Sequence, residues 1–225
     1  MRRPVLGVDG CRGGWLAAAV TGDQRRARLA GWALGRFDDV LAAGWDPAPD
    51  VVAVDIPVGL LDAGRRDCDV AGRHALGGRA AARVFLVPPR YAVEAPTYEA
   101  ANDLLRGRGE PAVSWQTYAL SRAILEVDAR LDDPRLYEVH PDLSFLAMTG
   151  RVLTSKHTAT GRTERHEALA GWLDVDDALA RRPTGAPSED AMDALAAAWS
   201  ATRVRAGLAV VHPAGTRARH PAIRA

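Results

Sequence analysis

Five acidic residues occupy places from which a folded chain can bring carboxylates together. Two of them follow the apolar runs VLGV and VVAV, one lies within LYEV, and two begin a long alanine-rich segment. They are Asp9, Asp55, Glu138, Asp190 and Asp193. Crowded carboxylates resist ionisation, and hard divalent cations relieve the repulsion because they prefer oxygen ligands. Two Mg²⁺ or Mn²⁺ ions about 4 Å apart activate water and stabilise the leaving oxygen of a phosphodiester, so this pattern favours a metal-dependent nuclease or phosphodiesterase.

Each acid also has a simpler explanation. Asp190 suits the first turn of a helix, where a negative charge is favourable, and Asp55 suits a turn before Ile-Pro. Glu138 has an arginine or His140 as alternative partners. Asp9 is harder to explain in this way, because an acid that interrupts an apolar strand is costly unless it is paired. We expect Glu138 to be a further catalytic acid and the metal ligands to be Asp9, Asp55, Asp190 and Asp193.

Basic residues that suit phosphate lie in two loops and at the first turn of the chain. Lys156 is the only lysine among the 29 Lys and Arg residues, and it lies in the segment SKHTATGR. Ser155, Thr158 and Gly161 give this segment the composition of an anion-binding loop. Arginine forks and a lysine point charge both bind phosphate, although a solvated surface explains the arginines equally well. The predicted phosphate or nucleic-acid contacts are Arg12, Arg79, Lys156, Arg162 and Arg165.

The apolar pattern predicts an α/β fold with a mixed sheet. Three strands joined by short turns form an antiparallel meander, and two later strands reached through helices are parallel additions, at residues 5–9, 15–20, 28–34, 51–54 and 136–139. Since ligands bind at the carboxyl ends of parallel strands, the strand-end acids should meet there. We expect one domain over residues 1–225, in which residues 60–130 form a helical insertion.

Helical spacing marks the elements that surround this sheet. It predicts helices at residues 37–43, 114–131, 164–173 and 190–205, and a short strand at 208–211. Asp190 and Asp193 are three residues apart and therefore share one face of the last helix. Trp115 begins the clearest long helix, where it fits a core position better than a base-stacking one.

The turn GCRGG between the first two strands has two interpretations. Its glycines suggest a phosphate cradle, but they match neither G-x-G-x-x-G nor G-x-x-x-x-G-K-[ST]. A strand follows the turn, so the helix N-terminus that normally attracts phosphate is missing. We expect a tight hairpin whose glycines keep side chains away from Asp9.

The composition limits which partners and which cellular compartment we expect for this protein. The 225 residues carry a formal net charge of +1, so no global charge indicates nucleic acid or an acidic membrane as a partner. We expect no signal peptide, because MRRPVLGVDG has basic residues but no long apolar region, and no apolar run reaches the roughly 18 residues of a membrane helix. Cys11 and Cys68 lie far apart without CxxC spacing, which indicates free thiols in a reducing cytosol. We expect a cytoplasmic protein of open oligomeric state, with a homodimer among the alternatives.

Eight short motifs occur in a fixed order along the chain. They are GVDGCRGGWLAA, DIPVGL, RDCD, VFLVPPR, SWQ, EVHPDLSF, SKHTATGR and DAMDALAAAWSA. Together they resemble the bacterial and archaeal family catalogued as domain of unknown function 429, over residues 5–210. That family is regarded as predicted nucleases with an RNase H-like fold. Ala82 and Arg83 stand where the family usually has small hydroxyl residues, so the resemblance assigns no role to their loop.

The resemblance implies a five-stranded sheet of order 3-2-1-4-5 with the second strand antiparallel to the rest. RuvC-type junction resolvases belong to the same fold group and carry acids on strands one and four and an Asp-x-x-Asp pair on the last helix. The residues that match those places are Asp9, Asp55, Asp190 and Asp193. Glu138 has no counterpart in that set and depends on the family's own EVHP stretch. The resemblance implies no particular substrate.

Two other kinds of protein fit parts of this pattern. Actin-like and sugar-kinase-like ATPases also begin with an aspartate and a glycine-rich hairpin, but they need two such domains, and 225 residues hold only one comfortably. A non-catalytic RNase H-fold binding module would use the same acids structurally. We therefore predict a hydrolase dependent on Mg²⁺ or Mn²⁺ whose partner is a nucleic acid or a nucleotide phosphoester.

Overall fold

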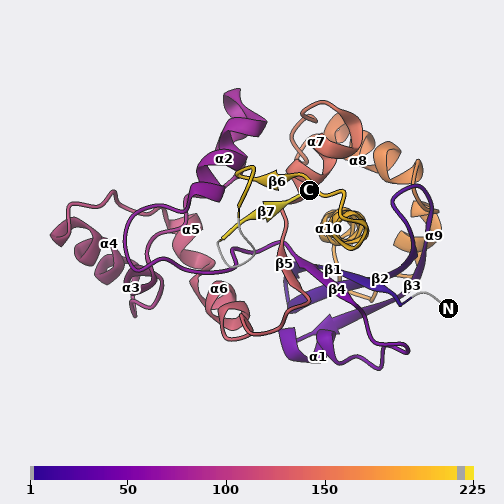
Figure 1. The fold of residues 1–225 in the computed structure, drawn as a ribbon, viewed down its shortest axis with the longest axis horizontal. Coiled ribbons are helices and arrows are strands. Elements are labelled where there is room, and N and C mark those ends of the chain that lie inside the picture. Colours follow the sequence, from indigo (N-terminus) through magenta and orange to yellow (C-terminus); the bar gives the residue numbers. More distant parts are fainter. Residues whose placement is uncertain (1–2, 217–220) are drawn as a thin grey trace. The chain divides into compact units, whose positions relative to one another are not determined.

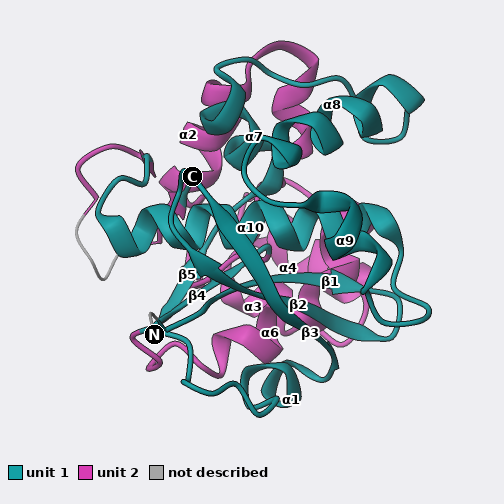
Figure 2. Ribbon diagram, turned by 90° about the vertical axis from the view of Figure 1, so that its right-hand side faces the viewer, with its two compact units in different colours: residues 1–55, 135–210, 224–225 teal, residues 56–134, 211–223 magenta. Residues whose placement is uncertain are grey.

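The structure is a computed structural model that describes residues 3–216 and 221–225. The chain forms two compact units, which Figure 2 shows in different colours. Unit 1 consists of Met1–Asp55, Arg135–Val210 and Arg224–Ala225, and unit 2 of Ile56–Pro134 and Val211–Ile223. Residues 60–130, where we expect a helical insertion, fall within unit 2.

Unit 1 contains a five-stranded mixed sheet (Figure 1). In chain order its strands are β1 (Val5–Cys11), β2 (Gly14–Gly22), β3 (Ala27–Gly35), β4 (Val51–Val54) and β5 (Leu136–Glu138). Their spatial order is β3-β2-β1-β4-β5. β2 runs antiparallel to β1 and β3, whereas β4 runs parallel to β1 and β5 parallel to β4. This topology confirms the predicted RNase H-like order 3-2-1-4-5.

The turn between β1 and β2 is a tight hairpin, as its glycines predicted. Cys11 pairs with Gly14, so Arg12 and Gly13 form the tip. Gly13 and Gly14 have φ angles of 116° and 130°, which residues with a side chain rarely adopt. A Cβ at Gly14 would also lie only 2.3 Å from the carbonyl oxygen of Gly35 in β3. The hairpin therefore needs glycine for both backbone conformation and space.

Helices cover both faces of the unit 1 sheet (Figure 1). They are α1 (Phe37–Leu41), α7 (Pro141–Thr149), α8 (Ala159–Ala170), α9 (Val175–Ala180) and α10 (Ser188–Ala206). α10 packs on β1, β2 and β4, and α7, α8 and α9 pack against α10 in turn. α1 lies on the opposite face, where the Phe37 ring meets Trp15 of β2 edge to face at 5.1 Å between centroids.

A glycine in β1 lets α10 approach the sheet closely. A Cβ at Gly7 would lie 2.1 Å from both the carbonyl oxygen of Ala194 and the amide nitrogen of Ala198. The part of α10 that covers the sheet is rich in alanine, and these residues are buried without projecting far from the helix. Gly7 and the alanines therefore set how closely α10 packs on β1.

Three predicted boundaries need correction. The single helix expected at 114–131 is divided at Leu120 into α5 (Trp115–Ala119) and α6 (Ser121–Asp128), because the Leu120 amide donates to Thr117 three residues back and the backbone there tightens. α8 begins at Ala159 instead of residue 164, since Thr158 caps it by accepting a hydrogen bond from the Gly161 amide. The strand expected at 208–211 begins only at Val211, as β6 (Val211–His212).

Unit 2 consists of short helices. They are α2 (Asp67–Leu76), the 3₁₀ helix η1 (Gly78–Arg83), α3 (Arg90–Val93), α4 (Tyr98–Gly107), α5 and α6. β6 pairs with β7 (Ile223–Arg224), whose last residue belongs to unit 1.

Trp115 is 63% exposed and stacks edge to face on Tyr98 at 5.5 Å, so the prediction of a core position is wrong. Within the described residues, none of the helices has the length and apolarity needed to cross a bilayer.

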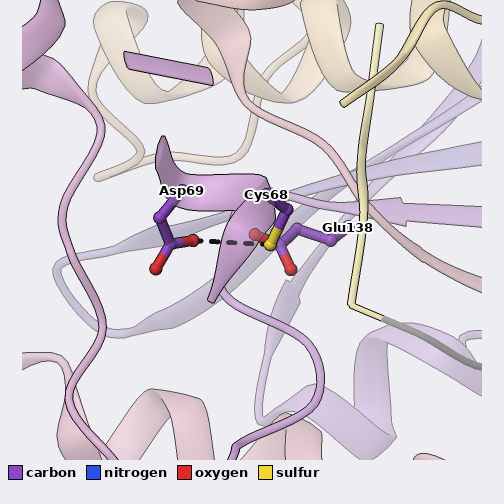
Figure 3. A group of neighbouring side chains, drawn as sticks. All are labelled: Cys68, Asp69 and Glu138. Carbon is purple, nitrogen blue, oxygen red and sulfur yellow. Dashed lines mark hydrogen bonds between the residues drawn. The ribbon is translucent and has the colours of Figure 1, made fainter. Parts of the chain in front are cut away.

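A buried polar group anchors the first turn of α2. Figure 3 shows the Cys68 thiol directed at the Asp69 carboxylate, to which it donates a hydrogen bond of 3.6 Å. Arg66 donates to Cys68 Sγ at 2.9 Å and pairs with Asp69 at 3.4 Å. The other oxygen of Asp69 accepts a hydrogen bond from the Val87 amide, which ties the segment before α3 to α2. Cys68 and Cys11 are both free thiols, as predicted.

Candidate metal site at the carboxyl ends of β1 and β4

The ends of β1 and β4 direct two acids to the face of the sheet that α10 covers. Gly7 faces α10, and strand side chains alternate, so Asp9 faces the same way. Ala53 belongs to the core that contains α10, so Asp55, two residues later, also points to this face. The Asp55 amide donates to the Val8 carbonyl oxygen at 2.9 Å, which extends the pairing of β1 and β4. The two carboxyl groups therefore lie on adjacent strand ends.

The first turns of α10 bring two more acids to the same place. Asp193 is next to Ala194, whose carbonyl oxygen lies against Gly7. Asp190 lies one turn earlier and is half-buried, whereas Asp193 is only 2% exposed. Asp190 and Asp193 both act electrostatically on Asp9. Four acids from β1, the end of β4 and α10 thus share one site within unit 1.

Burial and mutual repulsion make these acids resist ionisation. Burial raises the pKa of Asp9 well above its usual range, and the charges of Asp55, Asp193 and Asp190 raise it further. Burial also raises the pKa of Asp55 to about 7, although His140 opposes the shift. In the absence of a bound cation, these two groups therefore keep their protons to a higher pH than an ordinary aspartate does.

One ammonium group faces the four carboxylates. Lys156 Nζ donates a hydrogen bond of 2.5 Å to Asp193 Oδ2. Burial opposes the charge of Lys156, but Asp193, Asp9 and Asp55 together raise its pKa above its usual range. Burial raises the pKa of Asp193 even though Lys156 opposes that shift. The lysine is therefore charged and partly neutralises the site.

The loop before α8 fixes the backbone of Lys156. Thr158 donates from its amide and its hydroxyl to the Ser155 carbonyl oxygen, at 3.0 and 2.8 Å, and its hydroxyl also caps α8. On the other side of the lysine, the Thr154 amide donates to Glu164 at 2.7 Å. The loop closes tightly on α8, because a Cβ at Gly161 would lie 2.0 Å from the Ser155 carbonyl oxygen. The residues of SKHTATGR thus form a loop that is hydrogen-bonded on both sides of Lys156 and packed closely on α8.

Replacing Gly161 with alanine should move this loop. The added methyl group meets backbone that cannot rotate away, so we expect a loss of about 1–3 kcal/mol in the free energy of unfolding, measured by urea denaturation. Gly171→Ala is the matched control at the other end of α8, where a Cβ is 3.5 Å from its first neighbour and φ is −69°. Equal stability of the two variants would contradict this account of the loop.

Glu138 does not join the four aspartates. β4 and β5 pair Ala53 with Tyr137 and Val54 with Glu138. Ala53 and Tyr137 pack in the core on the α10 side of the sheet, so Glu138 points to the other face. It is 5% exposed there. Since the sheet separates it from the four aspartates, we leave Glu138 out of the proposed catalytic set.

Arg165 supports the loop instead of facing a substrate. Its side chain is buried, and it donates to the carbonyl oxygens of Thr154 at 2.7 Å and Gly161 at 2.9 Å. Its second terminal nitrogen pairs with Asp142 at 2.5 Å. We therefore withdraw Arg165 from the predicted phosphate contacts. Asp142 was not among the sequence candidates, and the only signal for it is its position two residues after His140 at the start of α7.

The other predicted phosphate contacts lie in different surroundings. Arg12 is exposed at the hairpin tip of unit 1. Arg162 is exposed on the first turn of α8 and pairs weakly with Glu189 of α10 at 3.5 Å. Arg79 is exposed on η1 in unit 2. Within unit 1, the side chains of Arg12 and Arg162 are therefore accessible to an anion in solution, although Arg162 also pairs with Glu189.

The chemistry of the site fits a hard divalent cation. Its donors are carboxylate oxygens, which suit Mg²⁺ and Mn²⁺. The thiol of Cys11 beside them keeps its proton, because burial and the charges of Asp190 and Asp9 raise its pKa to about 11. Among the described residues, no three of the four carboxylates each place an oxygen within 4.8 Å of one another. The four acids thus share one site, but their oxygens do not converge closely enough to surround one ion as they stand.

Solved structures similar to this chain include RuvC from Thermus thermophilus. One, described as T. thermophilus RuvC in complex with Holliday junction substrate, is 17% identical, with a TM-score of 0.45 over 92% of this chain and 98% of that chain. Another, described as Thermus thermophilus RuvC structure, is 15% identical, with a TM-score of 0.43 over 91% of this chain and 97% of that chain. No curated protein matches the chain. A family model described as Protein of unknown function (DUF429) matches residues 7–218.

Proposed function

Since the chain belongs to the DUF429 family, for which no function is described, we propose a function from its own acidic site: a divalent-metal-dependent nuclease or phosphodiesterase. The observation that carries the proposal is the convergence of Asp9, Asp55, Asp190 and Asp193, with Lys156 as their charged neighbour. Four acids ionised together beside a single ammonium would carry an excess of negative charge, which a divalent cation would neutralise.

The four aspartates would hold one or two Mg²⁺ or Mn²⁺ ions. Such an ion acts as a Lewis acid that activates water and stabilises the charge on a phosphoryl oxygen. The chain's own groups would bind and orient the substrate. Lys156 is at the site, and Arg162 and Arg12 are exposed within the same unit, so we assign phosphate contacts to these three residues. The substrate class is a nucleic acid or a nucleotide phosphoester.

A cleavage assay tests this function directly. Labelled single-stranded DNA, duplex DNA, a four-way DNA junction and single-stranded RNA are each incubated with the protein in Mg²⁺, Mn²⁺ or EDTA. We expect cleavage of at least one substrate with metal and none with EDTA. Asp9→Asn should lower the rate about 10³-fold, because several kcal/mol of transition-state stabilisation depends on the bound ion.

Asp177→Asn is the matched control. Asp177 is an exposed acid on α9 that pairs along its own helix, with Arg181 at 3.0 Å. Its loss should leave the cleavage rate unchanged. Cleavage in EDTA, equal rates for Asp9→Asn and the wild type, or no cleavage of any substrate with either metal would each refute the proposal.

A further inference from the structure

Lys156 already occupies the position of a cation in the acidic site. Its Nζ contacts Asp193 Oδ2 at 2.5 Å, and the charges of Asp9 and Asp55 also act on it. We propose that Lys156 is a built-in counter-ion, which pairs with Asp193 while the site lacks a divalent cation and leaves Asp193 when one is bound, so that its ammonium is then available to a substrate phosphate. This inference rests on the proposed function and concerns the same site.

The arrangement of the carboxylates supports this exchange. No three of the four place oxygens within 4.8 Å of one another among the described residues, so Asp193 is directed at Lys156 and not at a point shared with two other acids. The Asp193 side chain is 3% exposed, and without the ammonium its charge would be buried and unpaired. A divalent ion would supply that compensation and would repel the ammonium.

The structure allows the lysine side chain to move while its backbone stays in place. Thr154 and Thr158 anchor the loop on both sides of Lys156 through hydrogen bonds of 2.7 and 2.8 Å. The Lys156 side chain is nevertheless 38% exposed, so its flexible stem has solvent on one side. Release therefore requires rotation of one side chain and no rearrangement of the loop.

The choice of lysine at this position is informative. Lys156 is the only lysine among 29 Lys and Arg residues, so arginine serves as the cation everywhere else in the chain. An arginine fork binds a carboxylate through two parallel hydrogen bonds, whereas an ammonium is a compact point charge on a flexible stem. Lysine therefore suits a counter-ion that has to dissociate from Asp193 better than arginine does.

The single lysine also permits a selective measurement. Reductive methylation with ¹³C-formaldehyde labels Lys156 and the α-amino group and keeps the positive charge of the amine. In the metal-free wild type, the Lys156 methyl resonance should differ from that of Asp193→Asn, in which the pair is absent. Saturating Mg²⁺ should move the wild-type resonance to the Asp193→Asn position, while the α-amino resonance serves as the internal reference.

Metal affinity gives a second, independent readout. Calorimetric titration with Mn²⁺ should show about tenfold tighter binding for Lys156→Met, which has no ammonium to displace, and weaker binding for Lys156→Arg, whose fork holds Asp193 more firmly. If calorimetry shows that Mg²⁺ binds the wild type but saturating Mg²⁺ leaves the Lys156 resonance in place, or if Lys156→Met does not tighten Mn²⁺ binding, the counter-ion role is wrong and the nuclease proposal stands. If no metal binds the wild type at all, both proposals are wrong.

Discussion

In EDTA, the wild-type protein should lose stability relative to Asp55→Asn as the pH rises from about 4 to about 7. Burial raises the pKa of Asp55 to about 7 in the folded protein, whereas an unfolded aspartate titrates near 3.8. Below pH 4 both states hold the proton and the site costs nothing; between pH 4 and 7 the unfolded state releases the proton of Asp55 while the folded state retains it, so stability falls until Asp55 also ionises in the folded site near pH 7. The difference amounts to as much as about 4 kcal/mol for one group shifted by three pH units.

Urea denaturation at pH 4, 5, 6, 7 and 8 measures this effect. The charged groups that interact with Asp55 include His140, Asp193, Lys156, Asp142 and Asp9, and all of them are retained in the variant. Asp177→Asn, which removes an exposed acid, should follow the wild-type curve. If wild-type stability increases relative to Asp55→Asn over this range, the site does not resist ionisation as we describe.

Adding Mn²⁺ should reverse the fall in wild-type stability between about pH 4 and pH 7. A ligand that binds only the folded state stabilises it by about 2.7 kcal/mol at 100 times its dissociation constant. Because the ion binds ionised carboxylates, this stabilisation should grow with pH over the same range in which the metal-free protein weakens. The same titration of Asp55→Asn should show a smaller gain.

Gly7→Ala should be among the most destabilising single substitutions in unit 1. The added Cβ would lie 2.1 Å from backbone atoms of Ala194 and Ala198, so α10 has to move away from β1. Overpacking of this kind costs about 3 kcal/mol or more when the neighbour is backbone. Because Asp193 precedes Ala194, the displacement should also weaken Mn²⁺ binding.

Gly10→Ala is a control in the same strand. A Cβ at Gly10 would meet only the Trp15 ring at 3.9 Å, which is an ordinary contact. Thermal unfolding and Mn²⁺ titration of both variants should show a large loss for Gly7→Ala and little change for Gly10→Ala. A Gly7→Ala protein as stable as the wild type would mean that α10 is not seated on β1 as the structure shows.

Side-chain direction explains why the sequence was informative for some acids and not for others. Asp9 and Asp55 follow short apolar runs, and strand ends are visible in a sequence because the apolar pattern stops there. The face of the sheet that a residue occupies depends on strand register, and both faces of this sheet are covered. Glu138 lies in a strand as predicted, but its pairing with Val54 directs it away from α10.

The surroundings of the basic residues also could not be predicted from the sequence alone. The composition of SKHTATGR predicts an anion-binding loop, and in the structure Thr158 of this segment caps α8 and Gly161 allows a close backbone contact. Whether an arginine near it is exposed depends on a partner distant in sequence. Arg165 is buried because it pairs with Asp142, which lies 23 residues earlier in the chain. The composition around Arg165 does not reveal this partner.

By itself the sequence determined the five strands of unit 1 and the hairpin after Asp9, because strand periodicity and glycine conformation are local properties, while the order of the strands came from the resemblance to the family. Only the tertiary structure decided which charged groups share a site. Gly7 admits α10, α10 brings Asp193 to Lys156, and the sheet separates Glu138 from both. These relations depend on close packing and strand register between distant segments, which no local pattern encodes.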